Sequence, residues 1–295
     1  MSRNLHYSEA LLEGTRQLLE NDPSVYVMGP GVNGPKGIYG TTLGLKEEFG
    51  EDRILEMPHS ESAMTGMGIG SAIKGMKPIM VHQRVDFFLP AIQQLIHNGA
   101  KWNYIFGRQM EVPIVFRLII GRGWGQGPQR SQSLQSLFAH IPGLRVVMPT
   151  TAHDAKGMLN TALAGSDPVI FFESQRLYDI GELFEKEVPA DYYEIPFGPP
   201  AQRRVGKDIT LITVGATMYR ALEAADILEQ KYGVTCDVFD CRSISPLDYD
   251  PLIESVSKTG KVLLSSDACE RGSVLHDIGS KISQLAFDQL DAPPV

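Results

Sequence analysis

Short apolar runs alternate with longer segments of helical periodicity along the first part of the chain. The runs are rich in β-branched and aromatic residues, and they predict strands at 25–28, 78–81, 113–116, 144–148 and 168–172. Apolar residues at helical spacing predict helices over 8–21, 62–75, 89–106 and 153–164. Because such alternation places crossover helices over both faces of a sheet, we expect a mostly parallel sheet flanked by helices.

A second unit of the same kind follows an irregular segment. Strands are predicted at 209–214, 236–240 and 262–264, and helices at 218–231 and 250–258. The segment before them is rich in Pro, Tyr and acidic residues and has no period. The fold class is therefore α/β, with two consecutive α/β domains at 1–185 and 207–295 and a linker at 186–206, and a length of 295 residues supports two domains.

Composition excludes several classes of protein. The net charge is -8 and no basic run occurs, so a nucleic-acid partner is not expected. No apolar stretch is long enough to span a bilayer and no signal core begins the chain, which predicts a cytoplasmic protein, or one of an organelle matrix if a presequence was removed. The 3 cysteines are too few for a disulfide framework or a zinc site, so we expect buried free thiols and no metal site.

The segment 58–72 predicts a helix rich in small residues, with one carboxylate, Glu61, at its N-terminal end. Ser60 is suited to cap that helix, and the glycines at 66, 68 and 70 predict close packing against another backbone. Burial among the methionines at 57, 64 and 67 would let Glu61 share a proton with a ring nitrogen. The alternative is an acidic residue of an ordinary first turn.

Loops after the strands are the places where an open α/β sheet binds its ligands. The glycine-rich loop 29–37 lacks the Gly-Lys-Ser/Thr ending of a nucleotide site. The cationic loop 121–132, which includes Trp124, either closes over an anionic substrate or is a flexible surface loop. Phe87 follows a predicted strand and either stacks on a planar ring or packs in the core. Three histidines lie near strand ends and loops: His59, His82 and His140.

Several long strings, in the correct order, resemble a known family. They lie at 56–61, 112–117, 131–134, 140–149, 154–157, 167–173, 241–248 and 255–260. Together they cover nearly the whole chain, which resembles the β subunit of the thiamine-diphosphate-dependent 2-oxo acid dehydrogenase E1 component. The resemblance implies a transketolase-like pyrimidine-binding domain followed by a transketolase C-terminal-like domain. Family members usually continue through a further strand and tail, so the second domain either ends naturally at Val295 or is incomplete at its C-terminal end.

The resemblance also implies roles for residues. Glu61 matches the glutamate that hydrogen-bonds N1′ of the aminopyrimidine and so promotes removal of the thiazolium C2 proton. Phe87 matches an aromatic residue placed against the pyrimidine ring, and Met57, His59 and Gln83 complete the expected cofactor-binding set. The expected reaction is decarboxylation of a 2-oxo acid and transfer of the resulting acyl unit.

A partner is implied because half of the cofactor site is missing. The family's Gly-Asp-Gly signature for Mg²⁺ and diphosphate is absent from this chain. The resemblance implies that a separate α subunit supplies it in an α2β2 assembly, with a β–β contact through the C-terminal domain and a lipoyl acyltransferase as a further partner. The substrate stays open among pyruvate, branched-chain and other oxo acids.

Two positions depart from the family pattern. Arg130 replaces a histidine before Ser-Gln, and Pro30-Gly31 replaces an acidic pair. Arg130 remains a catalytic candidate, but its permanent charge cannot shuttle a proton. Two alternatives stay open: a split transketolase-like or carboligating enzyme with an aldehyde acceptor, in which Arg122 or Arg130 grips an anionic group, and a non-catalytic stabilising or regulatory subunit.

Overall fold

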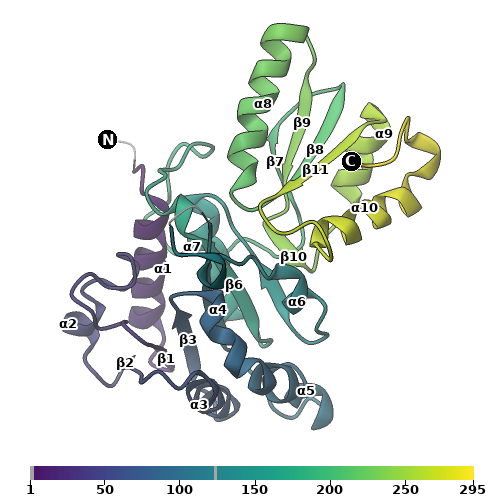
Figure 1. Cartoon of the computed structure of the whole chain (residues 1–295). Coiled ribbons are helices and arrows are strands. Elements are labelled where there is room, and N and C mark those ends of the chain that lie inside the picture. Colours follow the sequence, from purple (N-terminus) through teal and green to yellow (C-terminus); the bar gives the residue numbers. More distant parts are fainter. Residues whose placement is uncertain (1–2, 123–124) are drawn as a thin grey trace.

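Two sheets with helices on their faces make up the chain (Figure 1). The structure is a computed structural model that describes residues 3–122 and 125–295. The first sheet contains β1 Val25–Gly29, β2 Ile54–Glu56, β3 Lys77–His82, β4 Val115–Ile120, β5 Arg145–Val147, β6 Val169–Ser174 and β10 Ser243–Ser245. The second contains β7 Ala201–Arg204, β8 Ile209–Val214, β9 Cys236–Asp240 and β11 Val262–Ser266.

Helices and short helical turns connect these strands. The helices are α1 Tyr7–Asn21, α2 Leu45–Phe49, α3 Glu61–Ile73, α4 Val85–Phe88, α5 Trp102–Ile105, α6 Gln135–Ala139, α7 Ala152–Ala164, α8 Thr217–Tyr232, α9 Asp250–Thr259 and α10 Val274–Leu285. The turns are η1 Leu89–Ala91, η2 Gln94–Gly99, η3 Pro128–Arg130, η4 Gln175–Leu177 and η5 Phe287–Gln289. None of the helices in the described ranges combines the length and apolar character that crossing a membrane requires.

Both sheets are mostly parallel, as the alternation of strands and helices predicts. The first has the order β10-β5-β6-β4-β3-β1-β2, and only β10 runs antiparallel to its neighbour. The second has the order β11-β8-β9-β7, with β7 antiparallel to β9. The α/β fold class is therefore confirmed. Strand β7 lies within the range 186–206 assigned to the linker, and β10 extends the first sheet from within 207–295; the domain boundaries stay a prediction.

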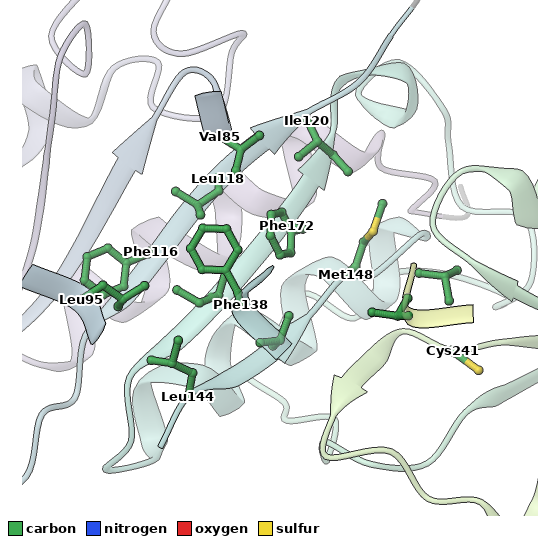
Figure 2. Close-up of a cluster of buried hydrophobic side chains, with 14 of the residues drawn as sticks. Val85, Leu95, Phe116, Leu118, Ile120, Phe138, Leu144, Met148, Phe172 and Cys241 are labelled. Carbon is green, nitrogen blue, oxygen red and sulfur yellow. The ribbon is translucent and has the colours of Figure 1, made fainter. Parts of the chain in front are cut away.

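Side chains of the central strands point alternately into two cores. On β4, Phe116 and Leu118 face the core covered by α3, α4 and α6, while Val115 and Ile119 face the core covered by α1 and α7. Figure 2 shows the first of these cores, with Phe116, Leu118 and Phe172 side by side. Since both faces are buried, the strands read as nearly continuous apolar runs, and in β4 only Arg117 interrupts the run.

The first core continues into the second sheet. Met148 and Cys241 lie toward the second unit in Figure 2. A side chain at Gly215 would overlap Met148, and Gly215 also has φ +76°, so glycine is required where β8 turns into α8. Below this contact Asp154 of α7 pairs with Arg203 and with Arg242. Apolar packing and ion pairs thus both join the two units.

Four local expectations are corrected by the structure. The predicted helix 89–106 is broken into η1, η2 and α5; Pro90, which has no N–H for a helical hydrogen bond, lies in η1, and Gly99 ends η2. Strand β4 begins at Val115, later than the predicted run 113–116. Ser60 occupies the N-cap of α3, but its side chain makes no capping hydrogen bond. Cys236 and Cys241 are buried as expected, whereas Cys269 is exposed.

Candidate active site

The carboxyl ends of five parallel strands meet along one edge of the first sheet. The strands β2, β1, β3, β4 and β6 are neighbours in that order and run in the same direction. The segments that leave this edge carry all the residues of the expected catalytic and cofactor-binding set. Gly123 and Trp124 of the loop after β4 lie outside the described residues.

Glu61 is the first residue of α3, directly after the short connection from β2. Its side chain is half-buried, and within 3–122 and 125–295 no hydrogen bond or ion pair engages its carboxylate. The next turns of α3 fix its position, because a Cβ at Gly68 would lie 2.5 Å from Met80 Cε and 3.1 Å from Ile114 Cδ1. Packing is close at Gly68, but its neighbours are side chains and not the second backbone that the sequence analysis expected, and a Cβ at Gly70 would meet no heavy atom within 4 Å. Met64 is buried, as the sequence analysis expected. Met67 is 59% exposed, so the expectation that it screens Glu61 from water is wrong.

Phe87 and Arg130 come together across the site. The Arg130 guanidinium lies over the Phe87 ring, 5.5 Å from its centre. Gln132 of the same loop donates a hydrogen bond to Asp86 of α4, at 2.7 Å. Phe87 still exposes 36% of its surface, so the ring remains accessible to a planar ligand. The helix α3 packs against η1, which begins two residues after Phe87.

The glycine-rich loop after β1 is held by Glu56, a residue that the sequence analysis missed. Its carboxylate accepts hydrogen bonds from the backbone N–H groups of Gly31, at 2.5 Å, and Asn33, at 3.0 Å. Strand β2 has only three residues, which is why its acidic end was not singled out.

Gln83 and Met57 reinforce the same loop. The Gln83 side chain donates to the Pro30 carbonyl at 3.2 Å, and a Cβ at Gly31 would lie 2.5 Å from Gln83 Nε2. Gly31 has φ +81°, so both its backbone conformation and the space around it require glycine. The Met57 N–H donates to the Gly29 carbonyl. Two of the expected cofactor-binding residues, Gln83 and Met57, therefore contact the glycine-rich loop 29–37, called the entrance loop below.

The three candidate histidines differ in their surroundings. His82, at the end of β3, is fully buried with its ring edge-on to Phe88, and burial lowers its pKa from 6.5 to about 3. His59 is exposed in the connection before Glu61, and His140 is exposed after α6. The neutral, buried His82 is a core residue, whereas His59 remains available to a ligand.

A buried ion pair lies in the sheet below this edge. Arg117 of β4 and Glu173 of β6 are fully buried, with Nε to Oε1 at 2.5 Å and Nη2 to Oε2 at 3.0 Å. The Tyr178 hydroxyl donates to the same carboxylate, and burial raises the Tyr178 pKa well above its ordinary value. Burial alone lowers the pKa of Arg117, but Glu173 outweighs it and the pKa is raised.

Arg84 is the second residue that the sequence analysis missed. It lies two residues after the end of β3, is only 3% exposed, and donates to Gln126 and Gln175 from two neighbouring loops. A cation so soon after a buried strand and shortly before an aromatic pair was a signal that could have found it.

The donor set fits one half of thiamine diphosphate. A half-buried carboxylate without a partner suits a ring nitrogen, and an exposed aromatic ring suits a planar heterocycle. No group of three or more His, Cys, Asp or Glu side chains in the described ranges is arranged to hold a metal ion. The residues present therefore fit the pyrimidine and offer no cradle for a metal diphosphate.

Comparison with known proteins gives the family. Residues 3–180 match the model of the transketolase pyrimidine binding domain, and residues 200–295 match that of the transketolase C-terminal domain. The 2-oxoisovalerate dehydrogenase subunit beta of Bacillus subtilis is 42% identical over 98% of this chain and 87% of its own length. The acetoin:2,6-dichlorophenolindophenol oxidoreductase subunit beta of Cupriavidus necator is 41% identical, over 99% and 88%.

The fold has a matching solved structure. A split gene transketolase, described as an inactive beta4 tetramer, superposes with a TM-score of 0.78 over 100% of this chain and 88% of that one, at 19% sequence identity. Both domain models, the near full-length relatives and this shared architecture agree. The chain belongs to the family of E1 β subunits of the thiamine-diphosphate-dependent 2-oxo acid dehydrogenases.

Proposed function

We propose that this chain is the β subunit of an enzyme that decarboxylates a 2-oxo acid with thiamine diphosphate and transfers the resulting acyl unit. One observation carries the proposal: the Glu61 carboxylate begins α3 without a partner in the described ranges, on the sheet edge that also presents the exposed Phe87 ring. The similarity to dehydrogenase β subunits supports it and gives no support to the two alternatives over it.

Each candidate residue has a task toward the pyrimidine. Glu61 would share a proton with N1′, and the backbone of α3 would hold its carboxylate in place. Phe87 would stack on the ring, and Met57 would add apolar contact. Gln83 would keep the entrance loop in shape through its bond to Pro30. When bound, thiamine diphosphate supplies the carbon nucleophile and the electron sink that the loss of carbon dioxide requires.

Arg130 would serve as an electrostatic group. Its guanidinium stays charged at any physiological pH, so it would hold an anionic carboxylate and not relay protons. In this position it would orient the 2-oxo acid next to the stacked ring, close to Phe87. Transfer to a lipoyl group would then need its proton from water or from another residue.

A second chain would complete the site. Mg²⁺ and the diphosphate would be held by an α-type subunit in an α2β2 assembly, because the described residues hold no metal cluster and the sequence has no Gly-Asp-Gly. The C-terminal domain would form the β–β contact, and a lipoyl acyltransferase would accept the acyl unit. A cytoplasmic or matrix location remains the prediction.

The test is turnover by the reconstituted complex. The chain is coexpressed with its α subunit, and oxidation of pyruvate, 2-oxoisovalerate and other 2-oxo acids is followed with an artificial electron acceptor. We expect Glu61→Gln to lower kcat by at least about 100-fold, the scale of general acid–base catalysis, with unchanged assembly and Tm.

The control variant is Glu20→Gln, which alters an exposed acid at the far end of α1 and should leave kcat unchanged. Product formed only with an aldehyde acceptor would favour the carboligating alternative. Full activity of Glu61→Gln would show that this chain has no catalytic part.

A further inference from the structure

Among the described residues, Arg84 is a buried cation without a counter-ion. Its Nε donates to Gln126 Oε1 at 3.0 Å, its Nη2 donates to Gln175 Oε1 at 2.5 Å, and its guanidinium lies 5.9 Å from the centre of the Tyr39 ring. Its Nη1 is buried and has no partner in the described ranges. All these neighbours are neutral, and the four residues outside those ranges, Met, Ser, Gly and Trp, carry no carboxylate side chain.

The other buried cations of the chain show that this is an exception. Lys156 is fully buried and reaches Glu13 at 2.7 Å, and Arg117 is fully buried against Glu173. A charge removed from water without an opposite charge destabilises the fold, which is why buried charges are normally paired. Arg84, at 3% exposure, has only amide oxygens and a ring face in place of a carboxylate.

The unpaired charge stands at the candidate active site. Arg84 directly follows Gln83 and is the N-cap residue of α4, the one-turn helix that contains Phe87. The Phe87 N–H donates a hydrogen bond to the Arg84 carbonyl at 3.2 Å, so the two residues are adjacent in the same turn. The side-chain partner of Arg84, Gln126, belongs to the same loop as Arg130, four residues earlier.

The contact with Gln126 is suited to exchange. Gln126 is exposed, and it stands between Gly125 at φ +66° and Gly127 at φ +71°, conformations that cost glycine little. The amide oxygen of Gln126 carries no charge, and it accepts from only one of the five N–H donors of the Arg84 guanidinium. A carboxylate or phosphonate in its place would bind two donors at once and add the missing negative charge.

We propose that Arg84 binds a second anionic group of the substrate, at the end remote from the 2-oxo carbon, and that Gln126 occupies this place when no substrate is bound. The substrate class is accordingly a 2-oxo acid with a distal oxyanion. The inference rests on the proposed function, and it names a determinant of specificity separate from Glu61 and Phe87.

The first test is binding without turnover. The α2β2 complex loaded with cofactor is titrated by calorimetry with glutarate and with 4-phosphonobutyrate, which carry two anionic groups and no keto group, and with valerate as the singly charged control. We expect glutarate or 4-phosphonobutyrate to bind at least about 10-fold more tightly than valerate, and the tighter of the two identifies carboxylate or phosphonate as the group. Arg84→Gln should abolish this preference, and Arg84→Lys should retain part of it.

The second test removes the competing amide. Gln126→Ala should strengthen binding of the preferred dianion several-fold, because Arg84 Nε then has no protein acceptor to give up. Gln129→Ala, at an exposed position of the same loop whose side chain has no hydrogen bond within the described ranges, should bind as the wild type does. This arm decides the question even if Arg84→Gln fails to assemble.

The third test is selectivity in turnover. The ratio of kcat/KM for 2-oxoglutarate to kcat/KM for 2-oxoisovalerate should fall by about 10- to 100-fold in Arg84→Gln, the range expected for a charged hydrogen bond. Equal binding of dianions and valerate, together with turnover of neutral 2-oxo acids, would refute the anion site and leave the proposed function standing. If the wild-type complex binds dianions, Arg84→Gln loses that binding, and no 2-oxo acid is turned over, the anion site is supported and the proposed function is refuted.

Discussion

The Arg130 guanidinium lies 5.5 Å from the centre of the Phe87 ring and joins the loop after β4 to the helix after β3. The sequence places these residues 43 positions apart, yet both follow parallel strands that are direct neighbours. A cation held over an aromatic ring at a partly exposed site contributes about 0.5–1 kcal/mol. This contact fixes the loop lightly enough for substrate to displace it.

Replacing Arg130 tests whether its charge contributes to substrate binding. In the reconstituted complex we expect Arg130→Gln to raise KM for 2-oxo acids about 10-fold, because a carboxylate loses a charged donor, with a smaller change in kcat. Steady-state kinetics with an artificial electron acceptor measures both. Arg130→His should increase transfer to a lipoyl acceptor, since a neutral or charged imidazole can carry a proton. An unchanged KM in Arg130→Gln would remove Arg130 from substrate binding.

Two glycines of α3 should respond in opposite ways to alanine. At Gly68 the new methyl would lie 2.5 Å from Met80 Cε, so we expect Gly68→Ala to destabilise the isolated chain by about 1–3 kcal/mol. At Gly70 no heavy atom lies within 4 Å, so Gly70→Ala should stabilise it by about 0.5–1 kcal/mol through helix propensity. Urea unfolding of both variants measures the difference, and equal effects would contradict the packing of α3 on β3.

The buried pair below the site should be far more sensitive than an exposed one. Glu173→Gln leaves the charge of Arg117 uncompensated inside the sheet, and we expect a loss of about 3–5 kcal/mol in the free energy of unfolding. Its control is Asp167→Asn, which breaks the ion pair with Arg145. The Asp167 side chain is 40% exposed and that of Arg145 is 45% exposed, so we expect a loss of only about 0–1 kcal/mol in the free energy of unfolding. Chemical denaturation compares them, and similar losses would show that burial does not set the energy of the pair.

His82 should make stability depend on pH. Burial lowers its pKa from 6.5 to about 3, so below pH 6.5 the unfolded chain binds a proton that the folded chain does not. The contribution of His82 is complete above pH 6.5 and is lost as the pH falls toward 3, at about 1.4 kcal/mol per pH unit.

The measurement is the free energy of unfolding of the wild type minus that of His82→Phe, at pH 7.5 and pH 5. The difference should shift by about 2 kcal/mol in favour of the variant at pH 5. His59→Phe, at an exposed position, serves as the matched control. A constant difference for His82→Phe would mean that His82 titrates normally.

The central architecture can be predicted from the sequence because strands buried on both faces appear as apolar runs. Strands β3, β4 and β6 have no exposed side, so their apolar runs stand out, and α1 and α7 keep a regular period. Short elements at the margins do not show such runs. Strand β2 has three residues, and β10 pairs with a strand nearly 100 positions earlier, so no local pattern could reveal either.

Candidates for the site could be proposed from the sequence only where the signal is local. Glu61 begins a helix and Phe87 belongs to an aromatic pair after a strand, and both remain proposals. Glu56 and Arg84 were missed because their roles depend on contacts made through folding: one carboxylate reaches a loop 23 and 25 positions away, and one guanidinium reaches amides 42 and 91 positions away. Charge and spacing alone do not encode such distant pairs.

Strand β10 has a consequence for the order in which the chain can mature. It covers the outer edge of β5, yet it emerges from the ribosome about 100 residues after that strand. Until then the backbone groups of β5 are open to pairing with any extended segment nearby, including one from another nascent chain. Fragments that end near residue 185 should therefore aggregate or recruit chaperones, and the first sheet is complete only after residue 245 has been synthesised.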